Sequence, residues 1–354
     1  MNSKRLKRRI GIITSAVLVL FVTECKKDIT ETPTSVTDTA SPAATSAAFN
    51  INASNGHQLA LDFTGFATTY VASAVINLNG AHSMTISGKS INGGTVPAIT
   101  LNNCYDIHIT QNQLANSKDV GIFLVNCHNI TIDHNYISNV SCGVYAENCT
   151  NGGGIQVINN QFKNMQGPIP RGQFVQFNNV YGVNNSITNN SGENIAGQSN
   201  PQDAINIFMS HGTAASPIIV TGNWIRGGGP STVGGGIMLG DNGGQYQIAS
   251  YNHLVDPGQY GMAISGGDHI TITNNSIYAR AQPFTNVGIY VWGQDGYTVT
   301  NSTVSGNQVK FINALNAEND SWLAPGTFTP VGWSANTFGA NITPSILPAT
   351  ITTF

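Results

Sequence analysis

Charged residues are scarce in this chain of 354 residues. They make up 9% of it, against about 25% in an ordinary soluble domain. With 14 basic and 17 acidic residues the formal net charge is −3, so the chain lacks the basic surface by which proteins bind nucleic acid. The composition is also unsuited to a coiled coil or a helical bundle, which needs more Ala, Glu, Lys and Leu. Apolar residues account for 40% of the chain and are evenly spread, which argues against disorder over most of it.

The chain also lacks a long apolar run. The longest one, residues 10–22, is too short to span a bilayer comfortably and follows the basic residues 4–9. Cys25 comes shortly after it, and the pattern resembles a bacterial lipoprotein signal, which implies that Cys25 is lipidated. We therefore expect a signal in residues 1–25 and a flexible tether in residues 26–50, rich in Thr, Ser, Ala and Pro. The resemblance implies an exported protein, periplasmic or at the cell surface, anchored through Cys25 to the inner or outer membrane.

The body of the chain is a repeat with a period of about 22–30 residues. Each unit begins with four residues whose second and fourth members are apolar, as in 121–124 and 236–239, so these two side chains should point inward. A second short strand follows and ends at an asparagine. These asparagines form one column: Asn112, Asn135, Asn160, Asn190, Asn223, Asn252, Asn275 and Asn307. We expect this column to occupy left-handed bends and to form hydrogen bonds between turns. Cys104, Cys127 and Cys149 form another column, which we expect to be buried.

Short strands stacked at a fixed period predict an all-β fold, a single-stranded right-handed parallel β-helix of about nine to ten turns. We expect the β-helix domain in residues 51–311 and a capping segment in residues 312–354, since solenoids need caps to cover their apolar ends. Units such as Asn129-Ile-Thr-Ile-Asp-His-Asn135 resemble those of the pectate-lyase-like superfamily over residues 75–311. This superfamily includes polysaccharide lyases, glycoside hydrolases, C5-epimerases and non-catalytic members, so the resemblance implies the fold more strongly than the activity.

Candidate site residues fall on outward strand positions and on the long loops between turns. The outward positions of the middle turns carry amides and an aromatic ring, a mixture that suits a sugar chain: Tyr145, Gln176, Asn178 and Asn206. The scarce charges gather on the middle turns and the loops that join them, where sites are commonly built. They include Arg171, Glu193, Asp203, His211, Arg226 and Asp241.

These residues favour a polysaccharide lyase that cleaves a uronate-containing glycan by β-elimination. Arg171 and Arg226 would neutralise the uronate carboxylate, while His211 or Tyr260 would transfer the proton. Gln176, Asn178, Asn206, Tyr145 and Asp241 would bind the substrate. No cofactor is required by the sequence, although Glu193 and Asp203 are candidate ligands for Ca²⁺.

Other functions remain open at this stage. A hydrolase would need two carboxylic acids from the group Glu193, Asp203 and Asp241. A C5-epimerase is disfavoured, because residues 256–259 read Asp-Pro-Gly-Gln and keep only the first half of the Asp-Pro-His-Asp motif. The fold also admits a non-catalytic glycan-binding or surface protein. In every case we expect a monomer whose partner is an acidic polysaccharide and not a nucleic acid.

Overall fold

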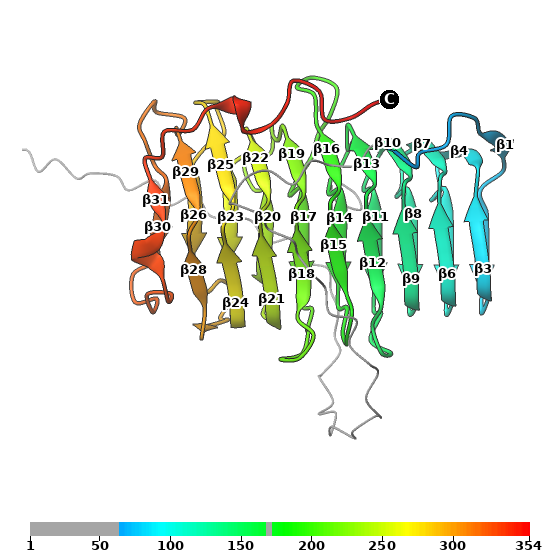
Figure 1. Ribbon diagram of the computed structural model, residues 1–354, viewed down its shortest axis with the longest axis horizontal. Helices are drawn as coiled ribbons and strands as arrows, with labels where there is room; N and C mark the ends of the chain where they lie inside the picture. The colour runs from blue at the N-terminus through cyan, green and yellow to red at the C-terminus, as the bar shows by residue number, and fades with distance from the viewer. Residues whose placement is uncertain (1–63, 168–171) are drawn as a thin grey trace, which may run out of the picture. The chain divides into compact units, whose positions relative to one another are not determined.

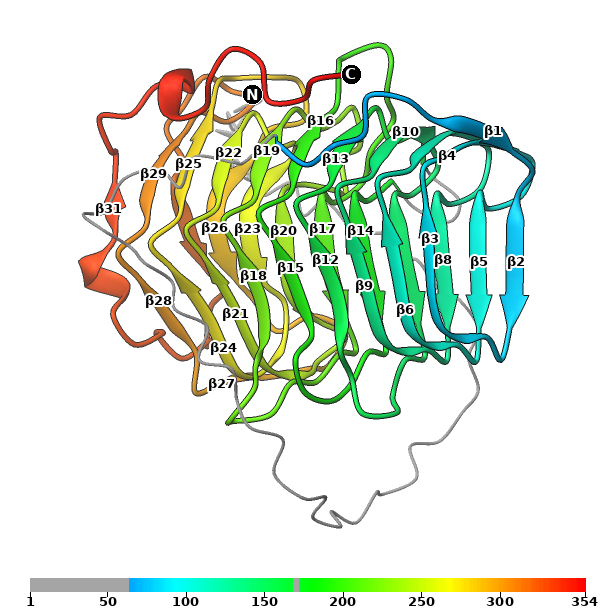
Figure 2. The same ribbon diagram turned by 45° about the vertical axis from the view of Figure 1, so that its right-hand side comes forward.

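The computed structural model describes residues 64–167 and 172–354. These residues form three long parallel sheets, A, B and C, joined by short turns. Successive turns of the chain stack on one another, as Figures 1 and 2 show. The predicted right-handed parallel β-helix is therefore confirmed.

Sheet B is formed by the first strand of each turn. It has ten strands in the order β2 (Ile76–Asn79), β5 (Ile99–Asn102), β8 (Ile122–Val125), β11 (Val144–Glu147), β14 (Val175–Asn178), β17 (Ile205–Phe208), β20 (Ile237–Asp241), β23 (Tyr260–Ile264), β26 (Val287–Val291) and β30 (Ser321–Leu323).

Sheet C follows in each turn. Its strands are β3 (His82–Ser87), β6 (Tyr105–Thr110), β9 (His128–Asp133), β12 (Ile155–Ile158), β15 (Ser186–Thr188), β18 (Ile218–Thr221), β21 (Gln245–Ser250), β24 (Gly267–Thr273) and β27 (Val299–Thr300), with β28 (Thr303–Ser305) also paired to β24.

Sheet A completes each turn. It contains β1 (Val71–Ser73), β4 (Lys89–Gly94), β7 (Gln113–Ser117), β10 (Tyr136–Val140), β13 (Gln161–Lys163), β16 (Ser191–Glu193), β19 (Trp224–Arg226), β22 (His253–Val255), β25 (Ser276–Ala279), β29 (Gln308–Phe311) and β31 (Thr337–Phe338). Two 3-10 turns, η1 (Trp333–Ala335) and η2 (Pro344–Ile346), lie near the C-terminus.

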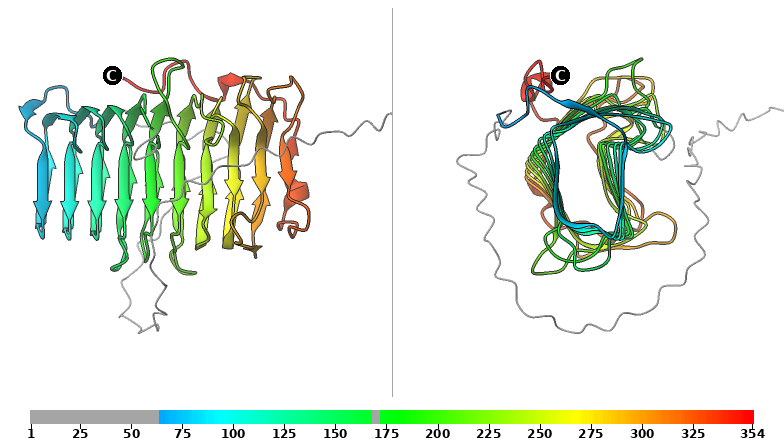
Figure 3. Two further views of the ribbon diagram at one scale, coloured as in Figure 1. Left: turned by 180° about the vertical axis from the view of Figure 1, so that it is seen from behind. Right: turned by 90° about the vertical axis from the view of Figure 1, so that its right-hand side faces the viewer.

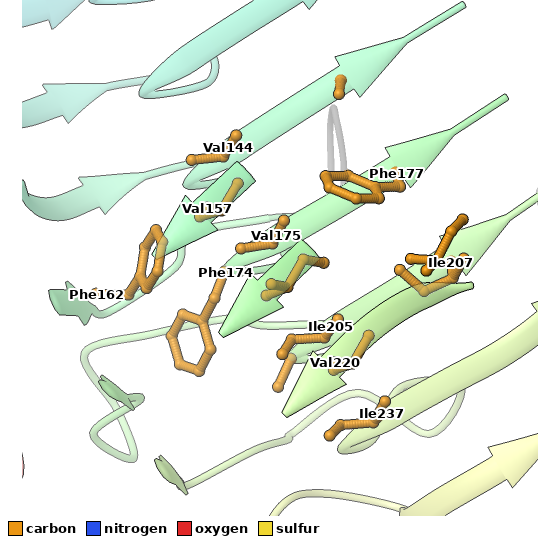
Figure 4. Close-up of a cluster of buried hydrophobic side chains, with 14 of the residues drawn as sticks. Val144, Val157, Phe162, Phe174, Val175, Phe177, Ile205, Ile207, Val220 and Ile237 are labelled. Carbon is orange, nitrogen blue, oxygen red and sulfur yellow. The ribbon is translucent and has the colours of Figure 1, made fainter. Parts of the chain in front are cut away.

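The core is a continuous column inside the stacked turns. Seen along the stacking direction, the turns superpose as closed loops around a common interior (Figure 3). Alternate side chains of each strand point into it, and Figure 4 shows Val144, Val175, Ile205 and Ile237 stacked in register. All four are at most 2% exposed, so the predicted inward positions are confirmed.

The asparagine column is a buried hydrogen-bonded ladder. Each side-chain amide nitrogen donates to the side-chain oxygen of the next turn, as from Asn190 to Asn223 at 3.0 Å and from Asn223 to Asn252 at 2.9 Å. The same oxygen also accepts the backbone N–H of the preceding turn's asparagine. Asn336 extends the ladder beyond Asn307.

We expected the ladder asparagines to occupy left-handed bends, and this prediction is wrong. The left-handed residue is the one just before the ladder, for example His134, Asn159, Asn189 and Asn274, with φ between 49° and 56°. The ladder asparagine itself satisfies the backbone groups that this bend leaves buried. A separate row of asparagines does adopt positive φ, at Asn103, Asn126, Asn148 and Asn179, and it lies on the surface.

The cysteine column is buried, as expected, and its thiols are free. Cys104, Cys127 and Cys149 are each 0% exposed, and the Cys149 Sγ accepts the backbone N–H of Cys127 at 3.3 Å. Burial is the main reason that the pKa of Cys127 is raised to about 11 and that of Cys149 to about 12. These thiols are therefore protonated at neutral pH and serve as small packing groups.

The sheets continue past residue 311, where we expected the β-helix to end. β30 adds a strand to sheet B and β31 adds one to sheet A. The following residues run back along the outer side of sheet A, where Leu347 and Ile351 pack with Trp224 and Val255 (Figure 1). The last segment therefore covers sheet A in addition to the final turn.

Candidate functional site

Two carboxylates lie close together on the outer side of sheet B. The amide nitrogen of Asn206, on β17, donates one hydrogen bond to Asp203 Oδ2 and one to Asp241 Oδ2, both 2.8 Å long. A planar amide has two N–H groups, so both are used on the carboxylates. The two oxygens therefore cannot lie farther apart than twice that distance. We call Asp203 and Asp241 the carboxylate pair and Asn206 its bridge.

A β-bulge places Asp241 beside this bridge. β17 and β20 pair Asn206 with Met238, but the register then shifts so that Phe208 faces Asp241. Gly240 provides the additional residue, with φ of 63°, and a Cβ there would come within 2.0 Å of the Gly266 carbonyl oxygen. Glycine is required at such a position, and bulges commonly re-aim side chains next to functional sites.

Asp203 is held in place by further donors. It comes two residues before β17, and its Oδ1 accepts hydrogen bonds from the Tyr260 hydroxyl and, at 3.1 Å, from the backbone N–H of Gly235. Its exposed fraction is only 4%. Burial, and then the charge of Asp203, raise the pKa of Tyr260 well above its usual value. Tyr260 is thus a neutral hydrogen-bond donor near neutral pH, which suits the acid form of the predicted proton-transfer role better than the base form.

Unpartnered polar atoms flank the carboxylate pair. Gln176 donates to the Asn206 side-chain oxygen at 3.1 Å, but its own Oε1 is buried without a hydrogen-bond partner. Gln173 Oε1, just before β14, and Ser265 Oγ, just after β23, are also buried without a hydrogen-bond partner. Each of these side chains is at most 1% exposed.

Aromatic rings line both ends of this outer face. Tyr145, on β11, accepts a hydrogen bond from Asn178 at 2.8 Å and packs edge-on against Phe123. At the other end, Tyr290 on β26 packs edge-on against Tyr260, with ring centroids 5.2 Å apart. The sequence-based choice of Tyr145, Gln176, Asn178, Asn206, Asp241 and Tyr260 therefore falls on one face of one sheet.

The structure places other predicted site residues elsewhere. Arg226 and Glu193 face each other on sheet A, where their side chains lie 3.6 Å apart. Arg226 also donates to the carbonyl oxygens of Pro348 and Ala349, at 2.6 and 2.8 Å, so it holds the C-terminal segment. Glu193 lies on β16 of sheet A and Asp203 just before β17 of sheet B, and neither belongs to a group of three or more His, Cys, Asp and Glu side chains that could hold a metal among the described residues. The calcium site that the sequence suggested is therefore not supported.

His211 lies beyond the end of β17 and forms isolated parallel bridges with Tyr181 on one side and Gln245 on the other. Its ring packs edge-on against that of Tyr181 at 4.5 Å, and burial lowers its pKa, so it is neutral near pH 7. Arg171 and Cys25 lie outside the described residues.

The class of protein is clear from this arrangement: a parallel β-helix with a polar site on the outer face of one sheet. The chain belongs to the family described as "Periplasmic copper-binding protein (NosD)", whose model matches residues 62–325. Among curated proteins no sequence match is found.

Several solved structures are similar at low identity. A catalytic domain of a GH87 α-1,3-glucanase in complex with nigerose is 14% identical, with a TM-score of 0.46, covering 76% of this chain and 63% of that one. A tailspike protein of E. coli bacteriophage HK620 in complex with a pentasaccharide is 11% identical, with a TM-score of 0.45, covering 76% and 58%. An alginate lyase from Paenibacillus sp. str. FPU-7 is 12% identical, with a TM-score of 0.37, covering 75% and 91%. The chain thus spans less than two thirds of the glucanase and tailspike chains.

The described residues do not fit the copper site that the family name implies. No group of three or more His, Cys, Asp and Glu side chains within 64–167 and 172–354 could hold a metal ion. The thiols of Cys127 and Cys149 are protonated, as shown above, whereas a metal binds the thiolate. The same part of the chain contains no helix long and apolar enough to cross a membrane.

Sequence reasoning missed Gln173 and Ser265 as site residues. Gln173 stands two residues before β14, as Asp203 does before β17, so strand spacing alone could have drawn attention to it. Ser265 directly follows β23, and the sequence around it carries no chemical signal of a site. Its buried, unpartnered hydroxyl is visible only in the structure.

Proposed function

We propose that this protein binds an uncharged glycan along the outer face of sheet B and hydrolyses it at the carboxylate pair. The observation that carries the proposal is the bridge itself, in which one amide nitrogen contacts Asp203 and Asp241 at 2.8 Å each. Glycoside hydrolysis uses two carboxyl groups, about 5–5.5 Å apart in retaining enzymes and about 6.5–9.5 Å apart in inverting ones. The two Oδ2 atoms lie no farther apart than twice 2.8 Å, which is below the inverting range, so we expect retention.

The two carboxylates would have different roles. Asp241 is half-buried and is the member of the pair that reaches solvent more readily, which suits proton exchange with the glycosidic oxygen. Asp203 is fixed by Tyr260, Gly235 and Asn206, and this preorganisation suits a nucleophile. Gln176 donates to the Asn206 side-chain oxygen and so helps to hold the bridge between them.

β-Elimination is less well supported by this geometry. Elimination needs a group that neutralises the uronate carboxylate. Arg226, which we expected to neutralise the uronate, is engaged with Glu193 and with the carbonyl groups of Pro348 and Ala349. The cleavage product distinguishes the two reactions, because elimination creates an absorbing unsaturated sugar and hydrolysis does not.

The experiment is a panel of neutral and uronate polysaccharides, assayed for new reducing ends and for ultraviolet absorbance. We expect reducing ends from a neutral polymer, retention of anomeric configuration by NMR, and at least a hundredfold loss of turnover in both Asp203→Asn and Asp241→Asn. Gln113→Glu, on sheet A, is the matched control for a change between amide and carboxylate. Unsaturated products, or full activity of Asp241→Asn, would contradict the proposal.

A non-catalytic glycan-binding role is the second candidate. The 4% exposure of Asp203 favours it, because a nucleophile has to contact the sugar ring. In that case the wild-type protein would bind a glycan of the panel in calorimetry and release no product from it.

We further propose that the chain is exported and anchored through a lipid on Cys25. This rests on the sequence pattern of residues 1–25. Metabolic labelling with a fatty-acid probe should mark the wild type and not Cys25→Ala, and the variant should leave the membrane fraction. Labelling of both forms would contradict the anchor.

A further inference from the structure

Two exposed tryptophans stand on the outer face of the last two strands of sheet B. Trp292 directly follows β26 and is 39% exposed, while Trp322 is the middle residue of β30 and is 42% exposed. Their ring centroids are 5.9 Å apart and the ring planes are inclined by 83°. The pair therefore forms a corner that presents a ring face and a ring edge. Single exposed apolar residues are ordinary, but two adjoining tryptophans expose a sizeable apolar surface.

The tryptophans are not needed to close the core. The neighbouring residues Val291 and Leu323 point inward, where Val291 is 0% exposed and Leu323 packs against the core cluster. Strand alternation then directs Trp292 and Trp322 outward. Their exposure is thus a feature of the outer face and does not compensate for a gap in the interior.

The tryptophan pair is continuous with the carboxylate site. Trp322 lies opposite Tyr290 in the sheet, and Tyr290 packs against Tyr260, whose hydroxyl donates to Asp203. Ser265, with its unpartnered hydroxyl, stands at the end of β23 between Asp241 and Trp292. Trp292 is two strands and Trp322 three strands from β20, or roughly 10 and 14 Å at ~4.8 Å per strand.

We propose that Trp292 and Trp322 form a distal subsite that binds a pyranose ring of the same glycan. This inference rests on the proposed function and extends it: the ligand is a chain of several sugars that runs along the stacking direction, with its distal end toward the C-terminal turns. The apolar face of an uncharged sugar packs on the exposed indole, while a hydroxyl beside it bonds to Gln294. Gln294 already donates to the Tyr290 hydroxyl at 3.2 Å, so its side chain is directed to this face.

The test measures binding to long and short probes without turnover. Asp241→Asn is titrated with disaccharides and hexasaccharides of α- and β-linked glucose by calorimetry, alone and combined with Trp292→Ala or Trp322→Ala. We expect the hexasaccharide that binds to lose about tenfold in affinity with either tryptophan change, whereas the matching disaccharide is unaffected. Trp322→Tyr should restore most of the loss. Phe328→Ala is the control, because Phe328 is an aromatic residue 66% exposed outside sheet B.

Each outcome bears on the subsite separately from the hydrolase proposal. Tryptophan-dependent binding without hydrolysis supports the subsite while the catalytic proposal fails. Hydrolysis of long chains with an unchanged KM in Trp322→Ala overturns the subsite and leaves the catalytic proposal standing. Equal binding by all variants, or no binding of any probe, also overturns it. So does a change of molecular mass by light scattering in Trp322→Ala, which would show that the pair contacts a second copy. A melting temperature within error of the parent confirms that each variant is folded.

Discussion

Removing one amide from the asparagine ladder should destabilise the whole β-helix. Asn223 is 1% exposed, and its side chain makes four hydrogen bonds. The amide nitrogen donates to the Ile187 carbonyl and to Asn252 Oδ1, both at 2.9 Å. The side-chain oxygen accepts from the backbone and the side chain of Asn190, both at 3.0 Å. Asn223→Ala removes all four and leaves the Asn190 backbone N–H buried without a partner.

The expected cost follows from which groups are left unsatisfied. An unsatisfied buried donor costs about 1–3 kcal/mol and each lost hydrogen bond a net of about 1 kcal/mol, and the two terms overlap. Asn252 Oδ1 still accepts the Asn223 backbone N–H, and Asn190 Nδ2 still donates to the Val157 carbonyl oxygen. These two side-chain atoms therefore keep one partner each, and the penalty falls mainly on the Asn190 backbone N–H. We expect roughly 3 kcal/mol of lost stability, which corresponds to several degrees in melting temperature for a domain of this size.

Urea denaturation and calorimetry measure this loss, and hydrogen exchange provides a local readout. The Asn190 amide should exchange much faster in Asn223→Ala, since its acceptor is gone. Asn77→Ala, at an exposed position of β2, is the matched control and should change stability by less than about 0.5 kcal/mol. An equally small loss for Asn223→Ala would show that water replaces the amide and would refute the ladder as a source of stability.

Four other perturbations test separate parts of the structure. Arg226→Ala should free the C-terminal segment, seen as faster proteolysis within 344–354; loss of turnover with that segment still protected would instead support a catalytic role. Tyr260→Phe removes a donor from Asp203, so turnover should fall about tenfold with little change in melting temperature, and unchanged turnover would count against the pair. Burial lowers the pKa of His253 to about 4, so the folded form resists protonation and stability should fall as pH drops from about 6.5 to about 4. His253→Gln should lose that part of the pH dependence, and a variant with the same pH profile as wild type would exclude His253 as its source. Gly240→Ala should displace Asp241 and abolish activity, because its Cβ would meet the Gly266 carbonyl oxygen; an active variant would show that the bulge is dispensable.

The fold could be predicted because the same local rule recurs in every turn. Alternating apolar residues and one asparagine per unit establish the register of all three sheets, and the buried ladder from Asn112 to Asn336 follows that register. The end of the repeat was harder to predict. β30 and β31 come after loops that interrupt the period, so their pairing with β26 and β29 depends on tertiary contacts.

The predicted site residues lie on two different sheets, and the sequence could have shown this by counting from the ladder asparagines. Glu193 and Arg226 each stand three residues after a ladder asparagine, Asn190 and Asn223, as Lys163 does after Asn160. This spacing puts all three in one column of sheet A, on a different sheet from Asn206. Because charged residues are scarce, Arg171 and Arg226 were both predicted to act on the substrate, whereas the structure shows Arg226 hydrogen-bonded to the C-terminal segment.

The carboxylate pair could not be derived from spacing, because it depends on an irregularity. Along β20, strict alternation from the inward residues Ile237 and Leu239 would direct Gly240 outward and Asp241 inward, away from Asn206. The bulge adds one residue and brings Asp241 opposite Phe208, within reach of the Asn206 amide. Gly240 alone in a sequence indicates only that a bulge is allowed. A bulge disrupts the pairing of a strand, and bulges are common next to active sites. The position of this bulge beside the two bridged carboxylates therefore supports a functional site there.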